Sequence, residues 1–571
     1  MMSVSSLQDD ETALLRGQYD HVPDNKSKAI RVFILLSHRY GGRLLPTIIG
    51  DTVFDSLYHV IHHNHIQNVD ENERLLLNKW YKLDENPFKS VYILQPVRNE
   101  DEQYGQKQWK YDEKRIISMM RKAADICLKN ATINQKERDE FFISVTAKEI
   151  YQAIENNRNK VANRILCFIR EITDIDHHLH EHDASKYVDM CDGEIDIEAV
   201  DYLNELKTTI KTALPPENIK ICMIRWSNLK SRETYLQQFS EDFYLMVKNQ
   251  IDKCVKTQPQ LMKLLDDSLQ YEILEHAIQC KSLTSRFFGR LDILEKIEEY
   301  MRLSDENRPC ILHGRSGYGK SSIMAKVATE ATKWYLNPSS VSVIIRFLGS
   351  TPASSDICKP LLNITQQISK LYNIDKNENI EIKNGNAIEL KNQLETVLKL
   401  IPNEQNLIIL LDSIDQLQKT DFDCLWLPLN YPKNVKCIIL TMPEESGINL
   451  LGILKKLLIE NYEHLFVEVD EFDKENGLNA FKSWLNIDKR KLTDNQKISV
   501  EKIFSKENYD GSPLFLSLIY DLVSNWHSYD TEIDQEFENI QNTEEAIKYV
   551  YNQLSIKHGK ILFEKAISYI Q

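Results

Sequence analysis

The sequence predicts an α/β protein whose core is a doubly wound parallel β-sheet. Between residue 287 and about residue 470, short and almost continuously apolar runs alternate with segments of helical periodicity. This alternation is typical of strands that helices cover on both faces. One apolar run also breaks into a glycine-rich loop that leads directly into a helix-forming segment, within residues 311–328. We therefore expect a ligand site at the carboxyl ends of the strands.

The glycine-rich loop has the spacing of a phosphate-binding loop (P-loop), G-x-x-x-x-G-K-[ST]. Its glycines allow backbone N–H groups to converge on phosphate oxygens. Lys320 can reach the β- and γ-phosphates, the Ser321 hydroxyl can bind Mg²⁺, and the helix that begins there presents its positive end to the anion. The nucleotide contacts predicted from this loop are Gly314, Arg315, Ser316, Gly317, Tyr318, Gly319, Lys320, Ser321 and Ser322.

A second motif supplies the acidic residue that a P-loop requires. The apolar run at residues 407–411 ends in Asp412, and Asp415 follows three positions later. We predict that Asp412 and Ser321 hold Mg²⁺, because magnesium favours few carboxylates combined with phosphates and water. Taken alone, Asp412 could instead cap a helix. Asp415 is the catalytic candidate, placed to orient or deprotonate the attacking water. No N-K-x-D sequence that would read guanine is present, which favours ATP over GTP.

Composition narrows the class of protein. The chain has 571 residues, enough for several domains, and a formal net charge of -15, which argues against sequence-independent nucleic-acid binding. Its ten cysteines are scattered without a C-x-x-C pair, as expected for reduced thiols. No apolar run approaches the ~18 residues of a membrane helix. We expect a cytoplasmic protein without a membrane segment.

Four regions follow from the patterning along the chain. Residues 1–100 contain two predicted strands, at 30–36 and 91–95, and read as a partial α/β domain whose beginning is missing. Residues 101–280 are expected to be mainly helical. Residues 281–470 form the nucleotide-binding domain, with strands predicted at 311–312, 341–347, 407–411, 435–440 and 465–469. Residues 471–571 are expected to be a helical, winged-helix-like region.

These motifs resemble those of the NACHT type of signal-transduction ATPase (STAND). Residues 287–290 (FFGR) resemble the adenine-side motif of that family, and residues 511–514 (GSPL) resemble its G-x-P element, whose proline meets the base. The resemblance therefore adds Gly289, Arg290 and Pro513 to the predicted nucleotide contacts. Three further segments, at 80–96, 144–150 and 346–352 (RFLGSTP), look like the NACHT and WD repeat domain-containing proteins.

The sequence also departs from that family. Gln416 stands where a second acidic residue is usual, and the fourth predicted strand ends in Thr-Met-Pro (441–443) without the arginine that many NACHT domains use to sense the γ-phosphate. Arg315 and Arg346 are the substitutes that we consider. No WD repeat, with its ~40-residue period, follows residue 470, so we expect a fragment or a short isoform.

The resemblance implies ATP and Mg²⁺ as cofactors, protein partners, and a homo-oligomer as an open alternative. We expect an ATP-binding, nucleotide-gated switch or scaffold in intracellular signalling or assembly, with slow ATP hydrolysis if it is an enzyme at all. The alternative is a nucleotide-independent interaction scaffold with a vestigial P-loop. Gln416 and the missing arginine favour that alternative, whereas the intact P-loop and Asp412 oppose it.

Overall fold

A computed structural model describes residues 16, 32–63, 71–97, 102–157, 164–191, 193–257, 268–351, 354–374, 381–443, 449–458, 463–507 and 509–569. These residues form two compact units. One unit contains the described residues from Ser268 onward, except 527–529, together with Arg16. The other contains those from Val32 to Thr257 together with the short segment 527–529.

The first unit is built on a five-stranded parallel sheet with the strand order β10-β11-β12-β9-β13. Its strands are β9 (Cys310–His313), β10 (Val341–Phe347), β11 (Asn406–Asp412), β12 (Val435–Thr441) and β13 (Phe466–Glu468). Each strand lies where an apolar run predicted one, so the doubly wound α/β fold is confirmed. The four longer strands are buried almost throughout, because helices cover both faces of the sheet.

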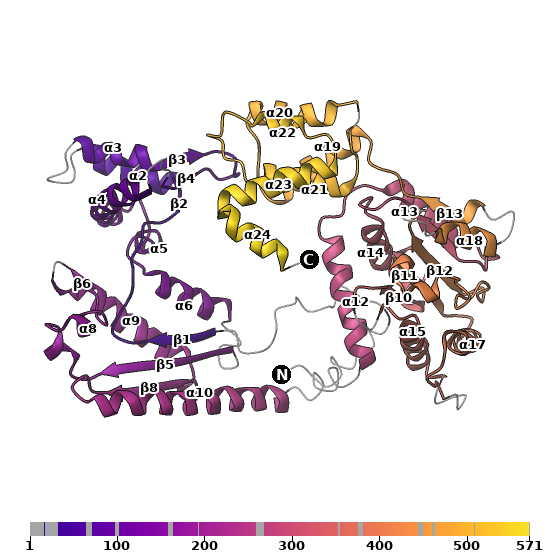
Figure 1. Ribbon diagram of the computed structural model, residues 1–571, viewed down its shortest axis with the longest axis horizontal. Helices are drawn as coiled ribbons and strands as arrows, with labels where there is room; N and C mark the ends of the chain where they lie inside the picture. The colour runs from indigo at the N-terminus through magenta and orange to yellow at the C-terminus, as the bar shows by residue number, and fades with distance from the viewer. Residues whose placement is uncertain are drawn as a thin grey trace. The chain divides into compact units, whose positions relative to one another are not determined.

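Two hydrophobic cores lie on opposite faces of this sheet, and Figure 1 shows the helices on either side of it. Along β10, Val343 and Ile345 belong to one core and Ile344 to the other, which is the alternation expected of a strand. The helices of the first core are α12 (Ser268–Thr284), α13 (Leu291–Arg302) and α14 (Lys320–Glu330). Those of the second core are α15 (Cys358–Leu371), α17 (Ala387–Leu398) and α18 (Leu450–Leu458).

The order of the strands in space differs from their order in the chain. β12 lies between β9 and β11, so the strand that leads into the P-loop and the strand that ends in Asp412 are not neighbours. β12 pairs with both of them, with Leu411 opposite Ile439 and His313 opposite Thr441. The carboxyl ends of three strands therefore meet at one edge of the sheet, where α/β folds of this kind bind ligands.

A helical region follows β13 in the same unit and is coloured orange to yellow in Figure 1. Its own core is rich in aromatic side chains, including Phe481, Trp484 and Tyr520. Phe288, from the segment before α13, packs against this core. Side-chain packing therefore joins the helical region to the sheet domain. The helices are α19 (Lys474–Ile487), α20 (Asp494–Ser505), α21 (Pro513–Val523), α22 (Gln535–Asn539), α23 (Thr543–His558) and α24 (Lys560–Ser568).

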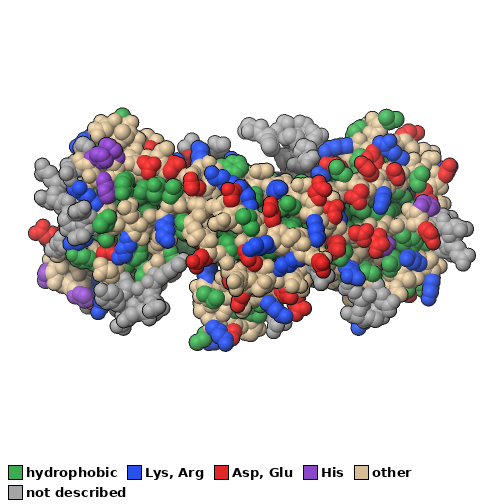
Figure 2. Space-filling model, turned by 90° about the horizontal axis from the view of Figure 1, so that it is seen from above, with side chains coloured by type: hydrophobic (Ala, Val, Ile, Leu, Met, Phe, Trp, Pro, Cys, Tyr) green, Lys and Arg blue, Asp and Glu red, His purple; other side chains and the backbone are tan. Residues whose placement is uncertain are grey.

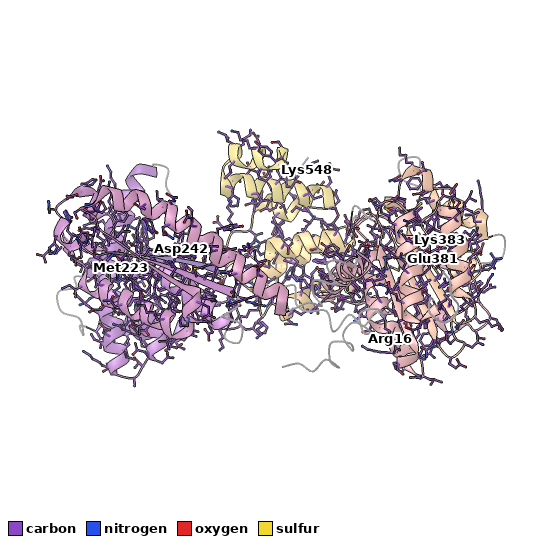
Figure 3. All side chains as sticks on the ribbon, turned by 90° about the horizontal axis from the view of Figure 1, so that it is seen from below. Arg16, Met223, Asp242, Glu381, Lys383 and Lys548 are labelled. Carbon is purple, nitrogen blue, oxygen red and sulfur yellow. The ribbon has the colours of Figure 1, made fainter. Side chains whose placement is uncertain are left out.

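The second unit contains a three-stranded parallel sheet with the order β1-β5-β8. Lys220 of this sheet forms an ion pair with Asp242 at 3.0 Å, and Met223 is exposed (Figure 3). Helices α6 and α9 supply buried side chains to one face, and Phe243 of α10 contacts Phe168 on the other. The bounds are β1 (Val32–Leu36), β5 (Ile165–Ile172), β8 (Ile219–Ile224), α6 (Val145–Asn156), α9 (Ile197–Ala213) and α10 (Leu229–Thr257).

The remaining elements of the second unit include a smaller antiparallel sheet, β2-β4-β3, with its own core, and a separate two-stranded antiparallel sheet, β6-β7. They are β2 (Ile48–Gly50), α2 (Asp51–His62), α3 (Glu71–Trp80), β3 (Tyr81–Asp84), β4 (Val91–Leu94), α4 (Glu102–Lys129), α5 (Gln135–Asp139), α8 (His182–Ser185), β6 (Met190–Cys191) and β7 (Glu194–Ile195). The two strands predicted before residue 100 are thus present as β1 and β4, but they belong to different sheets.

The sequence analysis missed β5 and β8, the two other strands of the sheet that contains β1. Both lie within residues 101–280, which we expected to be mainly helical. β5 is a short run that is buried along most of its length. Periodicity does not distinguish such a run from a segment of a buried helix.

No helix among the described residues is both long enough and apolar enough to cross a lipid bilayer. Acidic and basic side chains are interspersed on the face shown in Figure 2.

Candidate functional site

The P-loop connects β9 to α14, and close backbone approaches determine its shape. Gly317 and Gly319 have φ angles of 81° and 78°, which residues with a side chain rarely adopt. At Gly314, a Cβ atom would lie 2.4 Å from the carbonyl oxygen of Val469. The loop therefore requires glycine at these three positions.

Lys320 is the first residue of α14 and is buried. Its Nζ donates a hydrogen bond to the carbonyl oxygen of Arg315 at 2.8 Å. The lysine is therefore folded back over the loop, and it has a structural contact even without a phosphate. Among the other predicted loop contacts, Arg315 and Ser316 are exposed, whereas Tyr318 and Ser322 line a neighbouring cavity.

Asp412 lies at the end of β11, in hydrogen-bond contact with Ser321, the other predicted metal ligand. Its Oδ2 accepts hydrogen bonds from the hydroxyls of Ser321 at 2.9 Å and Ser413 at 3.0 Å. Its Oδ1 is buried and has no hydrogen-bond partner among the described residues. Burial, reinforced by the negative charge of Asp415, raises the pKa of Asp412 to about 6. A buried carboxylate oxygen without a partner, next to a serine hydroxyl, fits a hard divalent cation such as Mg²⁺.

Asp415 lies in the short helical turn Ile414–Gln416 that follows Asp412. Its Oδ2 accepts a hydrogen bond from Nε2 of Gln416 at 2.9 Å. Its Oδ1 is buried and, within the described part of the chain, also lacks a partner. The charge of Asp415 contributes to the raised pKa of Asp412. Gln416 therefore orients Asp415, and its amide cannot take a proton from water.

The two arginines considered as γ-phosphate sensors have different surroundings. Arg346 is buried at the end of β10, where its Nη1 donates to the carbonyl oxygen of Ile345 at 2.9 Å and its Nη2 donates to Oε1 of Gln367 at 2.7 Å. Its guanidinium thus has acceptors within the protein. Of the two, Arg315 alone belongs to the P-loop, where it is exposed.

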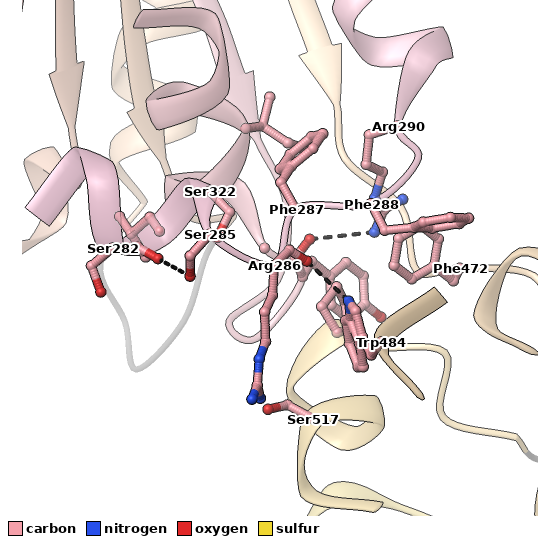
Figure 4. Close-up of a pocket in the computed structure, with 15 residues that line it drawn as sticks. Ser282, Ser285, Arg286, Phe287, Phe288, Arg290, Ser322, Phe472, Trp484 and Ser517 are labelled. Carbon is pink, nitrogen blue, oxygen red and sulfur yellow. Dashed lines mark hydrogen bonds between the residues drawn. The ribbon is translucent and has the colours of Figure 1, made fainter. Parts of the chain in front are cut away.

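A cavity of about 290 Å³ opens beside the P-loop (Figure 4). It is lined by Ser282, Leu283, Ser285, Arg286, Phe287, Phe288, Arg290, Tyr318, Gly319, Ser322, Ile323, Phe472, Trp484, Pro513 and Ser517. Aromatic walls with several hydroxyl groups suit a nucleobase and part of its ribose, and the volume is at the lower end for ligand sites. The phosphates of such a ligand would extend toward the P-loop.

Arg290 joins three parts of the cavity wall. Its guanidinium lies 4.0 Å from the centroid of the Phe472 ring, and its Nη2 donates to the carbonyl oxygen of Tyr318 at 3.3 Å. Burial lowers the pKa of Arg290. At Gly289, which has a φ of 66°, a Cβ atom would lie 3.6 Å from the same phenylalanine ring. These two predicted residues therefore shape the wall of the cavity.

The start of α21 packs directly on the P-loop. Cγ of Pro513 would lie 3.2 Å from a Cβ atom at Gly319, and the Leu514 N–H donates to the carbonyl oxygen of Gly317 at 3.2 Å. Helices α14 and α21 thus both begin at this loop. The N-terminus of a helix favours negative charge, so both helices contribute a positive potential there.

The structure brings the P-loop, Asp412, Asp415 and the GSPL element together, and it adds wall residues that the sequence analysis missed. Phe472, Trp484 and Ser517 are more than 150 positions from the P-loop. They form no motif with one another in the sequence, so linear spacing carried no signal for them. The Trp484 Nε1–H donates to the carbonyl oxygen of Arg286 at 3.0 Å and so joins the two sides of the cavity.

Comparison with known proteins identifies a NACHT domain at residues 308–487. The chain is 25% identical over 567 residues to "NACHT and WD repeat domain-containing protein 2" of Mus musculus, covering 94% of this chain and 31% of that protein. It is 24% identical over 556 residues to "NACHT domain- and WD repeat-containing protein 1" of Homo sapiens, covering 94% and 33%. These matches confirm the family resemblance. The chain spans about a third of the length of these relatives.

Among solved structures, the ORC1 protein of Aeropyrum pernix matches with 13% sequence identity and a TM-score of 0.29, covering 46% of this chain and 66% of that one. The α/β assignment rests on the sheet itself, with its five parallel strands and two helical layers.

We expect Lys320→Ala to weaken ATP binding by roughly 10- to 100-fold, because hydrogen bonds between charged groups are lost in the ground state. Equilibrium titration with a labelled ATP analogue measures the affinity. Lys333→Ala is the control, since Lys333 follows the same helix, is exposed and lies 4.0 Å from Glu330. Thermal melting of both variants separates ligand binding from loop stability. Equal affinity in all three proteins would refute the P-loop assignment.

We expect the gain in ATP affinity that Mg²⁺ provides to decline as the pH falls through about 6, because protonation removes the charge of Asp412. The raised pKa fixes the sign, since the ionised ligand predominates only above that value. ATP also titrates near this pH, so the protein's share is the difference between unmodified protein and Asp412→Asn. The variant should bind ATP normally in EDTA. Identical magnesium and pH dependence in both proteins would contradict a metal role for Asp412.

Proposed function

We propose that this chain, which contains a NACHT domain and is related to the NACHT and WD repeat domain-containing proteins, is an ATP-binding, nucleotide-gated switch or scaffold in intracellular signalling or assembly. The observation that carries the proposal is the junction of the Ser321–Asp412 hydrogen bond with an aromatic cavity at one edge of the sheet. Protein partners, a cytoplasmic location and self-association in a homo-oligomer belong to the same proposal.

Each group at the site has a distinct part in nucleotide binding. The base would occupy the cavity near Phe287 and Pro513, and the P-loop amides with Lys320 would hold the phosphates. Ser321 and Asp412 would hold Mg²⁺, which when bound neutralises phosphate charge. The buried carboxylate of Asp412 favours this cation, because the cation supplies the counter-charge that water would supply at the surface.

The cavity wall explains how nucleotide could act as a switch. One side comes from the segment 282–290 and the P-loop, and the other side comes from the helical region through Trp484, Pro513 and Ser517. A ligand that contacts both sides stabilises their present packing relative to an open arrangement. Since ATP and ADP differ at the γ-phosphate, the groups near Asp412 and Asp415 would distinguish the two states.

We predict that the unmodified chain hydrolyses ATP well below the ~10 s⁻¹ that is usual for enzymes. Asp415 is the acidic group placed to handle the attacking water, Gln416 cannot accept a proton, and Arg346 is engaged by its own acceptors. A supplied arginine contributes roughly 10³- to 10⁵-fold in related phosphoryl transfers, so its absence should dominate the rate. Single-turnover hydrolysis measures this rate, and Asp415→Asn should lower it further without weakening ATP binding.

Two outcomes would change the assignment. Fast turnover by the unmodified chain would mean that a residue such as Arg315 completes the site and that the protein is an active ATPase. A lack of ATP binding at any magnesium concentration would favour the nucleotide-independent scaffold.

A further inference from the structure

Residues 346–351, here called the RFLGST segment, are singled out by the family resemblance but have no part in the nucleotide contacts described above. The segment leaves the sheet beside Asp412. Phe347 is the register partner of Asp412 in β11. One residue later, the Leu348 N–H donates to the carbonyl oxygen of Asp412 at 3.0 Å. Backbone contact between this segment and Asp412 therefore continues one residue past the end of β10.

The next residue, Gly349, is packed against the turn that carries Asp415. It has a φ of 75°, and a Cβ atom added to it would lie 2.6 Å from Cβ of Gln416. Farther along, the carbonyl oxygen of Ser355 accepts a hydrogen bond from the Gln418 N–H at 3.2 Å. The segment after β10 thus contacts the chain at Gln416, the last residue of the Asp415 turn, and at Gln418, two residues later.

Hydroxyl groups fix the shape of this loop. The Thr351 N–H donates to Oγ of Ser354 at 2.9 Å, and the Ser354 N–H donates to Oγ1 of Thr351 at 3.1 Å. The Gly349 N–H also donates to the carbonyl oxygen of Ser354 at 3.1 Å. Ser354 is fully buried. These reciprocal bonds hold Thr351 and Ser354 against each other.

Helix α12 anchors the loop through two buried side chains, Glu272 and His276. Oε1 of Glu272 accepts hydrogen bonds from the Thr351 hydroxyl at 3.1 Å and from Nε2 of His276 at 3.1 Å. Nδ1 of His276 accepts the Phe347 N–H at 3.2 Å. Because a backbone N–H is always a donor, the imidazole proton lies on Nε2, and the histidine bridges the strand end and the carboxylate.

We propose that the RFLGST segment, anchored to α12 by Glu272 and His276, is a positioning device that fixes Asp412 for Mg²⁺ and Asp415 for the attacking water. This inference rests on the proposed nucleotide function. Helix α12 also joins this segment to the cavity, because it continues to Ser282 in the cavity wall (Figure 4). Thr351 and Glu272 act through other residues and need not touch the ligand.

The test compares Thr351→Val with Thr351→Ser, which differ in the hydroxyl that reaches Glu272. Three quantities are measured on the full chain: ATP affinity in EDTA, the gain in affinity on adding Mg²⁺, and the single-turnover hydrolysis rate. Groups that orient metal ligands typically change metal affinity or activity about 10- to 100-fold. We therefore expect Thr351→Val to reduce the magnesium gain and the rate about tenfold while ATP affinity in EDTA stays unchanged. Thr351→Ser should behave as the unmodified chain does.

Gly349→Ala provides a second, steric perturbation of the same turn. It should also reduce the magnesium gain while leaving ATP affinity in EDTA unchanged. A merely structural role would instead reduce all three quantities together. The inference is overturned if both Thr351→Val and Gly349→Ala leave the magnesium gain unchanged in a chain that binds ATP. It is also overturned if Thr351→Ser fails as Thr351→Val does. Failure of the unmodified chain to bind ATP would overturn the proposed function, and this inference with it.

Discussion

The buried carboxylate of Asp412 is the constraint on which the arrangement of the site depends. Burial raises its pKa from 3.8 to about 6, which corresponds to about 3 kcal/mol of disfavoured ionisation at neutral pH. The folded protein pays this cost above that pKa, because the unfolded chain ionises more readily. Two serine hydroxyls compensate one oxygen, and the other has no partner in the described residues. A divalent cation would offset this cost of the buried charge, so the cost favours cation binding.

A second constraint is the contact of glycine backbones with neighbouring segments. A side chain at Gly314 would collide with the backbone of Val469, and one at Gly511 would collide with the backbone of Phe472. A side chain at Gly319 would crowd Pro513, a contact that a small shift can relieve. The P-loop therefore keeps its shape only while the end of β13 and the start of α21 remain in place. A change in the conformation of the P-loop on binding phosphate would therefore alter its packing against the helical region. This packing gives the switch hypothesis its physical content.

The sequence predicted the five-stranded α/β domain well, because its signals are local. A P-loop spans eight residues, and an acidic residue at the tip of an apolar strand is recognisable from a few positions. The insertion of β12 between β9 and β11 was not predicted, since chain order does not determine strand order. The aromatic wall at Phe472 and Trp484 was also missed, because only the fold brings these rings to the cavity. The hydrogen bond from Lys320 to the carbonyl oxygen of Arg315 was not predicted either.

The central claim is that this P-loop holds an adenine nucleotide with Mg²⁺. The most direct measurement is the nucleotide content of the purified, unmodified chain after denaturation, followed by uptake of labelled ATP with and without Mg²⁺ and in competition with GTP. The account predicts adenine nucleotide approaching one per chain, magnesium-dependent uptake, and displacement by ATP in preference to GTP. A chain that carries no nucleotide and takes up none under any of these conditions would contradict it.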